Sequence, residues 1–420
     1  GIKGFAPIGK DKENCLLGTL DGQNHAIRNL FINKPGKKYV ALFGYVGNDF
    51  VEAHIKNLAL IDIKVVGTQN VGSFAGVSYG TIENCFVTGF LMDDQGSNAQ
   101  TVGGIVGKNK EGEIVVGLIK NCYADVTIEG SFNLGGIAGQ EDGGGIIEDC
   151  FAAGTILAKS PNGAAGGIVG AFNAGQAVIR NVSLMKWIKG EKDTDKIIGQ
   201  LYDESGEQIK ENVSWEGTRI IGNEPEIQPV IWEEASSAQL TSLAYWKSLG
   251  WDFESTWGWY GSESAGKPIL KSFPVDWQSN DLDLITPFAI ISRPVNKAKA
   301  DFSTEISARI VGPIDPESVS LVFGDKPDGR SFISRIPMTQ SSDRTWTASI
   351  PPRKGGFVYY YIEAKAGNES LTKPYDISRS IAVDIDDGTI RGQPEEVVVS
   401  LGEKQSSMRF KWITVPQVFG

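Results

Sequence analysis

Gly103-Gly104-Ile105-Val106-Gly107 is one copy of a short motif that recurs through the first part of the chain. The other copies are Val40-Ala41-Leu42-Phe43-Gly44, Gly72-Ser73-Phe74-Ala75-Gly76, Gly135-Gly136-Ile137-Ala138-Gly139 and Gly166-Gly167-Ile168-Val169-Gly170, with a weaker sixth copy at Ile197-Ile198-Gly199. The final glycines of the five strong copies are separated by 32, 31, 32 and 31 residues. A fixed period of this length is typical of a solenoid in which each repeat forms one coil.

A second motif alternates with the first. Its copies are Ile27-Arg28-Asn29-Leu30, Ile55-Lys56-Asn57-Leu58, Ile82-Glu83-Asn84-Cys85, Ile119-Lys120-Asn121-Cys122, Ile147-Glu148-Asp149-Cys150 and Ile179-Arg180-Asn181-Val182. The β-like runs between the motifs show no helical period, and polar inserts at 93–98 and 108–113 are expected as loops. The sequence therefore predicts an all-β protein whose first 190 residues form a right-handed parallel β-helix. Its glycines would provide positive φ or close approach between coils, and its asparagines the left-handed turn.

These repeats resemble the GLUG-motif repeats of bacterial surface proteins, in which "GGIVG" is followed by an "IxNCYxxGxI" strand. The opening Phe5-Ala6-Pro7-Ile8-Gly9 is similar to the first coil of such domains, except that the strand usually preceding Pro-Ile-Gly is missing. We therefore expect that the chain begins inside a domain. The resemblance covers residues 1–275 and implies an extracellular or cell-surface location. It implies no single function, because such repeats occur in adhesins, peptidases and other surface proteins.

Tryptophan concentrates where the repeat weakens. Eight of the ten tryptophans lie between Trp187 and Trp277. Terminal solenoid repeats are usually atypical, because a cap must cover the end of the core. Residues 191–277 are therefore predicted to be a tryptophan-rich C-terminal cap with one short helix within 235–249.

The rest of the chain predicts further β domains. Residues 278–294 are polar and proline-flanked, which is typical of a linker. Short alternating runs at 305–310, 319–323, 345–350, 357–364 and 380–385 predict an Ig-like β-sandwich over 295–385, and this segment resembles Ig-like domains of secreted bacterial enzymes. Residues 386–420 are similar to the first strands of the fibronectin-like domain that precedes metallophosphoesterases of the purple acid phosphatase type.

Composition excludes several classes of partner. The formal net charge is -11 and the pI is near 4.9, which argues against nucleic acid, because a phosphate-binding face needs clustered Lys and Arg. The sequence contains no run of 18 apolar residues, which is about the length needed to span a membrane. The four cysteines and two histidines show no metal-ligand spacing. We therefore expect no catalytic residue, no cofactor and no metal site in this segment.

Two columns of repeat positions could still carry chemistry. Cys85, Cys122 and Cys150 share one position with Leu58 and Val182, which favours a core ladder over a disulfide or a metal column. The next position places Phe86, Tyr123 and Phe151 in an aromatic stack, which would be either a carbohydrate platform or packing between coils. Trp257 and Trp259 present the same choice between carbohydrate contact and cap core.

Two other readings concern acidic residues. Asp384-Ile385-Asp386-Asp387-Gly388 resembles part of a calcium loop, but it lacks the distal Glu, so an acidic turn is preferred over structural calcium. Polysaccharide-active β-helices need clustered carboxylates on one face. The repeat alignment shows no acidic column, because Asp62 aligns with Gly89 and Val126.

The sequence leaves two main functional hypotheses. The first is a non-catalytic structural or adhesive surface module, acting as a rigid spacer or binding surface. Its partners would be cell-wall or extracellular polysaccharide, or other copies of itself in a surface assembly. The second is an accessory region of a secreted metallophosphoesterase whose catalytic domain lies beyond residue 420. A polysaccharide-active β-helix enzyme is a third and weaker alternative.

Overall fold

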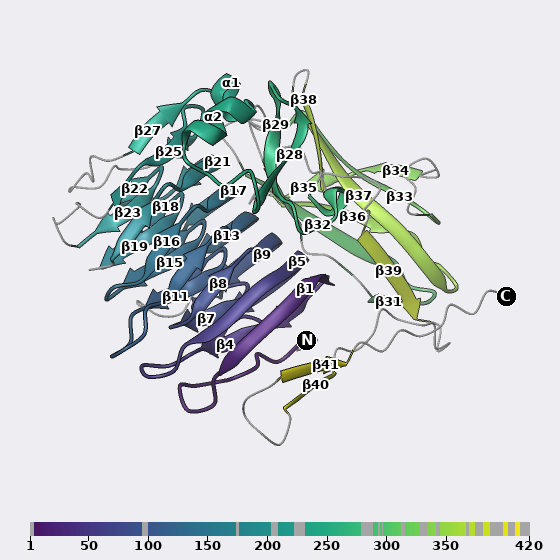
Figure 1. Ribbon diagram of the computed structural model, residues 1–420. Helices are drawn as coiled ribbons and strands as arrows, with labels where there is room; N and C mark the ends of the chain where they lie inside the picture. Colours follow the sequence, from purple (N-terminus) through teal and green to yellow (C-terminus); the bar gives the residue numbers. More distant parts are fainter. Residues whose placement is uncertain are drawn as a thin grey trace. The chain divides into compact units, whose positions relative to one another are not determined.

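The computed structural model divides the chain into two compact units, residues 1–284 with 405–407 and residues 285–404 with 408–420 (Figure 1). It describes residues 4–94, 100–173, 176–202, 209–221, 232–278, 289–292, 295, 297–311, 316–326, 334–341, 345–366, 369–373, 381–386, 398–401 and 408–411. Each unit is almost entirely β-structure.

The first unit is a parallel β-solenoid of about six turns built from three sheets. The largest, called the long sheet, has 15 strands and receives one to three from each coil. Its strands are β1 (Gly18–Arg28), β2 (Phe31–Asn33), β5 (Ala53–Gly67), β8 (Thr81–Glu83), β9 (Phe86–Asp93), β12 (Leu118–Lys120), β13 (Tyr123–Gly130), β16 (Ile146–Glu148), β17 (Phe151–Ala158), β20 (Ala177–Ile179), β21 (Val182–Lys189), β24 (Ile209–Lys210), β25 (Asn212–Trp215), β26 (Arg219–Ile221) and β27 (Trp232–Ala235).

Two six-stranded parallel sheets complete the coils. The second sheet contains β3 (Lys38–Val40), β6 (Gln69–Val71), β10 (Thr101–Gly103), β14 (Asn133–Gly135), β18 (Ala165–Gly166) and β22 (Thr194–Asp195). The third sheet contains β4 (Phe43–Val46), β7 (Ala75–Ser78), β11 (Val106–Lys110), β15 (Ala138–Asp142), β19 (Val169–Asn173) and β23 (Ile198–Leu201). The two motifs of the sequence therefore lie in different sheets of each coil.

The glycines that end the first motif form one column on the third sheet. The strand registers place Gly44, Gly76, Gly107, Gly139, Gly170 and Gly199 opposite one another in successive coils. None of the six has a positive φ. A Cβ at Gly139 would instead lie 2.6 Å from the backbone nitrogen of Val102 and 2.8 Å from the carbonyl oxygen of Gly107. Of the two reasons that predict glycine at this position, close backbone approach is therefore the one that applies.

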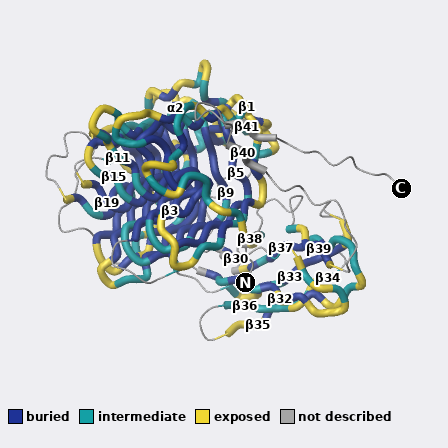
Figure 2. The backbone as a smooth tube through the Cα atoms, turned by 90° about the horizontal axis from the view of Figure 1, so that it is seen from below, coloured by how far each residue is buried: buried dark blue, intermediate teal, exposed yellow. Residues whose placement is uncertain are grey.

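The second motif supplies both the turn and the core. Asn57, Asn84, Asn121 and Asp149 have φ between 50° and 53°, the left-handed region that Asn and Asp tolerate best. The isoleucine two residues earlier points inward and is fully buried. Its column consists of Ile55, Ile82, Ile119, Ile147, Val178 and Ile209. Figure 2 shows the buried interior that these columns create. Each such side chain stabilises the fold by about 1.5–3 kcal/mol through burial.

The sequence alignment of the second motif is wrong for its first and last copies. Val182 pairs with Phe151, so the residue beside Cys150 is Asn181. The left-handed position of that coil is filled by Arg180, with φ 54°, so every residue of the motif is displaced by one. In the first coil, Leu58 pairs with His25 rather than Leu30.

The tryptophan-rich segment does not form only an end cap. Coils continue through β22 to β27, within the stretch predicted as the cap. Residues 236–278, here called the tryptophan strap, then pack along the outer face of the long sheet. The strap contains α1 (Ser237–Leu240), α2 (Leu243–Ser248), the hairpin β28 (Trp257–Ser262) and β29 (Ala265–Leu270), and a 3-10 turn, η2 (Val275–Trp277). Where one helix is predicted, two short helices form.

The strap runs back along the solenoid from its last coils to its first. At one end, Leu240 and Trp246 share a buried cluster with Trp215 and Ala235 of the last coils. At the other end, the Trp277 ring lies 4.8 Å from the Arg28 guanidinium of the first coil. The strap therefore covers a lateral face of the coils.

The second unit contains two β-sheets that share one hydrophobic core. One sheet has the order β30-β32-β36-β35, and the other has β31-β39-β37-β33-β34, with β38 beside β37. Their bounds are β30 (Ala289–Ser292), β31 (Lys297–Lys299), β32 (Thr304–Val311), β33 (Ser318–Gly324), β34 (Ser334–Pro337), β35 (Thr339–Gln340), β36 (Thr345–Ile350), β37 (Gly356–Ala366), β38 (Glu369–Lys373) and β39 (Ile381–Asp386). All five strands expected here are present.

Two predicted segments of the second unit differ or are only partly described. β30 lies inside the stretch predicted as a linker, and its Ile290 is fully buried in the core. Residues 279–288 of that stretch lie outside the described part of the chain. In the predicted fibronectin-like segment, β40 (Val398–Leu401) and β41 (Met408–Lys411) form an antiparallel pair.

Candidate functional site

The aromatic column on the long sheet is regular and buried. Phe86 and Tyr123 stack at 4.8 Å between ring centroids with an interplanar angle of 6°, and Tyr123 and Phe151 stack at 4.6 Å and 4°. The parallel register of β9, β13 and β17 produces this stacking, because it places the three residues directly opposite one another. At most 4% of any of the three residues is exposed.

The strap covers this column with its own aromatic rings. Phe273 contacts Phe86 edge-on at 5.1 Å. Around Phe151 lie Trp246, Trp251 and Trp257, with centroids 6.0, 6.4 and 5.8 Å away. The stack is therefore a packing surface, and a sugar ring cannot reach it. Among the five residues considered for carbohydrate contact, only Trp259 is partly exposed.

Polar contacts fix the strap to the coils. The Gln278 side chain is buried, accepts from Leu270 N at 2.8 Å and donates to Leu270 O at 2.9 Å. Its Oε1 also accepts from the Tyr123 hydroxyl at 3.3 Å. The Trp251 indole donates to Arg180 O at 3.0 Å. These bonds satisfy polar groups that burial under the strap would otherwise leave without partners.

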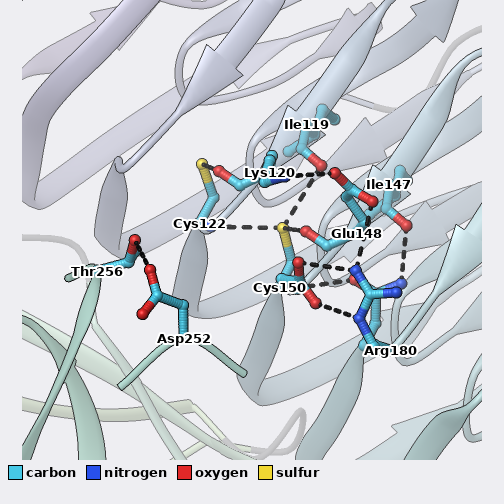
Figure 3. Close-up of polar contacts among 11 residues, drawn as sticks. Ile119, Lys120, Cys122, Ile147, Glu148, Cys150, Arg180, Asp252 and Thr256 are labelled. Carbon is cyan, nitrogen blue, oxygen red and sulfur yellow. Dashed lines mark hydrogen bonds and ion pairs between the residues drawn. The ribbon is translucent and has the colours of Figure 1, made fainter. Parts of the chain in front are cut away.

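The carboxylate of Asp252 fixes the bend of the chain before β28 through local hydrogen bonds. Asp252 accepts hydrogen bonds from the backbone nitrogens of Glu254 and Ser255 and from the Ser255 hydroxyl. It also accepts from the Thr256 hydroxyl at 3.0 Å (Figure 3). These bonds, led by the one from the Ser255 hydroxyl, favour the ionised form and lower the pKa of Asp252 to about 2. This carboxylate therefore has a local structural role.

The cysteine column lies beside the aromatic column and is part of a hydrogen-bonded ladder (Figure 3). The Cys150 thiol lies 3.2 Å from Glu148 O and 3.7 Å from Ile119 O, either of which can accept its single proton, and it accepts from Cys122 N at 3.4 Å. In the next coil, the Asn181 amide makes the equivalent bonds, to Ile147 O at 3.0 Å and from Cys150 N at 3.0 Å. The thiols therefore occupy the positions of asparagine side chains in one continuous ladder.

The thiols of this ladder are free and fully buried. Burial raises the pKa of the Cys85 and Cys150 thiols, which keeps them protonated and unreactive. Within the residues that the structure describes, no group of three or more His, Cys, Asp or Glu side chains is placed to hold a metal ion. The ladder geometry fits a structural role better than a metal or redox column.

Replacing Cys150 tests the ladder directly. Cys150→Asn should leave the free energy of unfolding within about 1 kcal/mol of the parent value, because the amide can make both bonds of the thiol. Cys150→Ala should lower it by about 1–2 kcal/mol, because Cys122 N loses its acceptor in a buried site. Urea unfolding followed by circular dichroism measures both. Equal losses for the two variants would contradict the asparagine-like role of the thiol.

Charged side chains alternate in sign along the column that stands two residues before the cysteines. The strand registers place Asp21, Lys56, Glu83, Lys120 and Glu148 opposite one another in five successive coils. Lys120 Nζ lies 2.8 Å from Glu148 Oε1. One position further along the chain, Arg180 Nε of the next coil lies 2.7 Å from Asp149 Oδ1. Opposite charges directly across strands favour this register, because a slipped register loses the pairs.

A carboxylic acid is buried inside the coils beneath the third sheet. Glu141 lies opposite Asn109, and neither side chain is exposed. Asn109 Nδ2 donates to Glu141 Oε1 at 3.0 Å, whereas Glu141 Oε2 and Asn109 Oδ1 have no hydrogen-bond partner among the described residues. Burial raises the pKa of Glu141 well above its ordinary value, and the nearby charge of Asp142 raises it further.

Glu141 should make the stability of the solenoid depend on pH. Its raised pKa means that the folded state binds the proton more tightly than the unfolded state. The stabilisation is therefore complete below the ordinary carboxyl pKa and is lost as the pH rises. Glu141→Gln should match the stability of the parent protein at about pH 4 and be more stable at about pH 8. The difference in unfolding free energy should be about 1.4 kcal/mol for each unit by which the folded-state pKa of Glu141 exceeds its unfolded value, up to the pH of the measurement. Urea unfolding at both pH values measures this, and an equal difference at both would contradict it.

The histidines lie in two strands, His25 in β1 and His54 in β5. His25 Nδ1 lies 3.0 Å from Gly22 O, and His54 Nε2 lies 3.3 Å from Glu52 Oε1. Asp384 is nearly buried in β39, and Asp387 and Gly388 of the calcium-like stretch lie outside the described residues. None of the helices in the described ranges is long and apolar enough to cross a membrane.

Comparison with known proteins finds partial relatives. No protein-family model matches the chain. Over 115 residues the chain is 36% identical to halomucin of Haloquadratum walsbyi, a match that covers 27% of this chain and 1% of that protein. Over 164 residues it is 31% identical to the immunoglobulin A1 protease of Streptococcus sanguinis, covering 37% of this chain and 8% of that protein. The chain thus spans at most 8% of the length of either relative. Both are surface or secreted proteins, and the parallel β-solenoid is compatible with a structural module of such a protein.

Proposed function

We propose that this chain is a non-catalytic structural module of a larger extracellular or cell-surface protein, in which the solenoid acts as a rigid spacer that holds its last coils away from the point where the chain enters and leaves it. The continuity of its hydrogen bonding carries this proposal. Strands of each coil pair with those of the coils before and after it in three sheets. The interior columns are fully buried, and the strap ties the first coils to the last. Such a stack resists bending, because any bend must open bonds or packed layers.

The finer assignments rest on resemblance and belong to this proposal. The motifs support GLUG-type repeats, and the two packed sheets of the second unit support an Ig-like domain. The proposed fibronectin-like start at residue 386, and with it the accessory role beside a metallophosphoesterase, rests on the resemblance of residues 394–412. A metal-binding set of Asp, His and Asn in the sequence beyond residue 420 would support that role.

A carbohydrate-binding role is a second proposal that one observation favours. The partly exposed Trp259 donates from its indole nitrogen to Ser262 O at 2.7 Å, which fixes the ring orientation. A fixed, partly exposed indole suits stacking against cell-wall polysaccharide. Trp259→Ala should then abolish retention of the protein on immobilised polysaccharide, whereas unchanged retention would exclude this residue.

Two measurements test the spacer proposal. With Cys15 changed to Ser, dyes at Lys37→Cys and Lys189→Cys should report one narrow distance distribution by single-molecule energy transfer. Several distances or a broad distribution would contradict rigidity. In parallel, the full chain should show no turnover of pectin, other polysaccharides or phosphate esters, with and without calcium or zinc. Turnover that a single acidic substitution abolishes would overturn the non-catalytic assignment.

A further inference from the structure

Two loops on one edge of the solenoid are joined across an intervening coil. The first, residues 47–52, connects β4 to β5, and the second, residues 111–117, connects β11 to β12. The coil between them turns tightly, because β7 ends at Ser78 and β8 begins at Thr81. The second loop reaches over that turn, and Ile114 N donates to Asp49 O at 3.2 Å.

The joined loops present three large apolar side chains to solvent. Phe50 is 57% exposed, Val51 is 42% exposed and Ile114 is 75% exposed. Only six large hydrophobic residues among those described are exposed to this degree, so half of them lie on these two loops. A contiguous exposed apolar patch often marks an interaction site. We call these three residues the loop patch.

Local hydrogen bonds hold the patch in place before any partner binds. Asn48 Oδ1 accepts from Phe50 N at 3.0 Å and from Val51 N at 2.9 Å, and Asn48 N donates to Val51 O. Val115 anchors the second loop by packing against the cluster of Tyr45, Val77 and Tyr79. A preformed patch loses little conformational entropy on binding, which favours affinity.

The charges around the patch are mainly negative. Glu52, Glu111 and Glu113 are exposed carboxylates on the same two loops. The cations nearby already have partners, since Lys12 Nζ lies 2.6 Å from Asp49 and Lys110 Nζ lies 3.1 Å from Asp142. An apolar patch with an acidic rim is complementary to a cationic, apolar surface.

We propose that the loop patch is a docking surface for a cationic, apolar segment of a partner protein. A second copy of this chain is disfavoured, because it would bring the same acidic rim and a net charge of -11 against the first. A membrane surface is disfavoured because its anionic lipids repel the same carboxylates. The docking surface depends on the loop geometry and does not rest on the spacer function.

Binding of a model peptide to the full chain tests this surface. The probe is a fluorescent peptide of alternating Leu and Lys, and its acidic control alternates Leu and Glu. We expect the protein to bind the Leu-Lys peptide and not the Leu-Glu peptide. The double variant Phe50→Ser, Ile114→Ser should weaken binding by about tenfold or more, since it removes the apolar anchors and keeps every charge. The triple variant Glu52→Gln, Glu111→Gln, Glu113→Gln should weaken it and reduce its salt dependence.

Matched controls make the result decisive. Phe302→Ser removes a side chain that is 67% exposed elsewhere in the chain and should leave the affinity unchanged. Thermal unfolding should be the same for all variants, because the substituted residues are exposed. The proposal is overturned if the parent protein does not bind the Leu-Lys peptide, or if Phe302→Ser weakens binding as much as the patch variant does. It is also overturned if the patch variant abolishes self-association in sedimentation velocity, or binding to phosphatidylserine vesicles, instead of peptide binding.

Discussion

Trp257→Ala is expected to lower the free energy of unfolding of the solenoid by about 3–5 kcal/mol. The Trp257 side chain is fully buried, and its ring lies 4.6 Å from that of Trp251 and 5.8 Å from that of Phe151. Its removal leaves a cavity between the strap and the aromatic column that the surrounding rings cannot fill without moving. Urea unfolding monitored by the remaining tryptophan fluorescence measures the loss.

Trp259→Ala is the matched control, because it removes the same side chain two residues further along β28. Trp259 is only partly buried, so the loss of its packing should lower the free energy of unfolding by about 1 kcal/mol or less, in addition to the loss of its hydrogen bond to Ser262 O. Equal losses for the two variants would show that the strap does not pack on the coils as described.

Gly139→Ala is expected to destabilise the solenoid by about 3 kcal/mol, at the upper end of the usual cost of overpacking. The added Cβ would lie 2.6 Å from Val102 N and 2.8 Å from Gly107 O, both of which are backbone atoms of neighbouring strands. Backbone atoms cannot rotate away as a side chain can, so the sheets must separate locally. Chemical unfolding gives the free energy, and hydrogen exchange should show increased opening of β10 and β15.

The same substitution at Gly143 separates collision from backbone preference. A Cβ there meets nothing within 4 Å, but φ is +75°. Gly143→Ala should therefore cost only about 1 kcal/mol, from the left-handed conformation. If Gly143→Ala were as harmful as Gly139→Ala, close approach between coils would not explain the repeated glycine.

The period of the glycine motif was sufficient to predict the coils. A glycine required by close approach must recur once per turn, so Gly44, Gly76 and Gly107 mark the same point of three coils. The left-handed asparagine and the buried isoleucine recur for equally local reasons. Any feature that each coil must repeat by itself is therefore visible in a single sequence.

Features that depend on neighbouring coils were harder to predict. The left-handed position is held by Arg180 and Glu211 in the later coils, so matching asparagines to one another shifted the alignment by one residue. That shift concealed Asn181 as the neighbour of Cys150, and with it the ladder that explains the thiols. The polar signal was present in Asn181 and Asn212, but only the strand register reveals it.

The strap and the buried acid were missed for different reasons. The tryptophans predicted a buried segment, but composition does not indicate whether it covers the end or the side of a solenoid. The decisive contact joins Phe86 to Phe273, which are far apart in sequence. Glu141 lies in the polar run Gln140-Glu141-Asp142, where the sequence does not distinguish the one buried residue from its partly exposed neighbours.

The returning strap also determines how the solenoid would respond to mechanical tension. The Trp277 ring contacts Arg28 of β1, so the chain leaves the strap beside the first coils. A pull applied between residues 18 and 278 would enter and leave the solenoid at neighbouring points. Most of the stacked coils would then lie outside the loaded path, and the strap would bear the first strain at Gln278. Extension would begin by peeling the strap from the aromatic column, before any coil had to unwind.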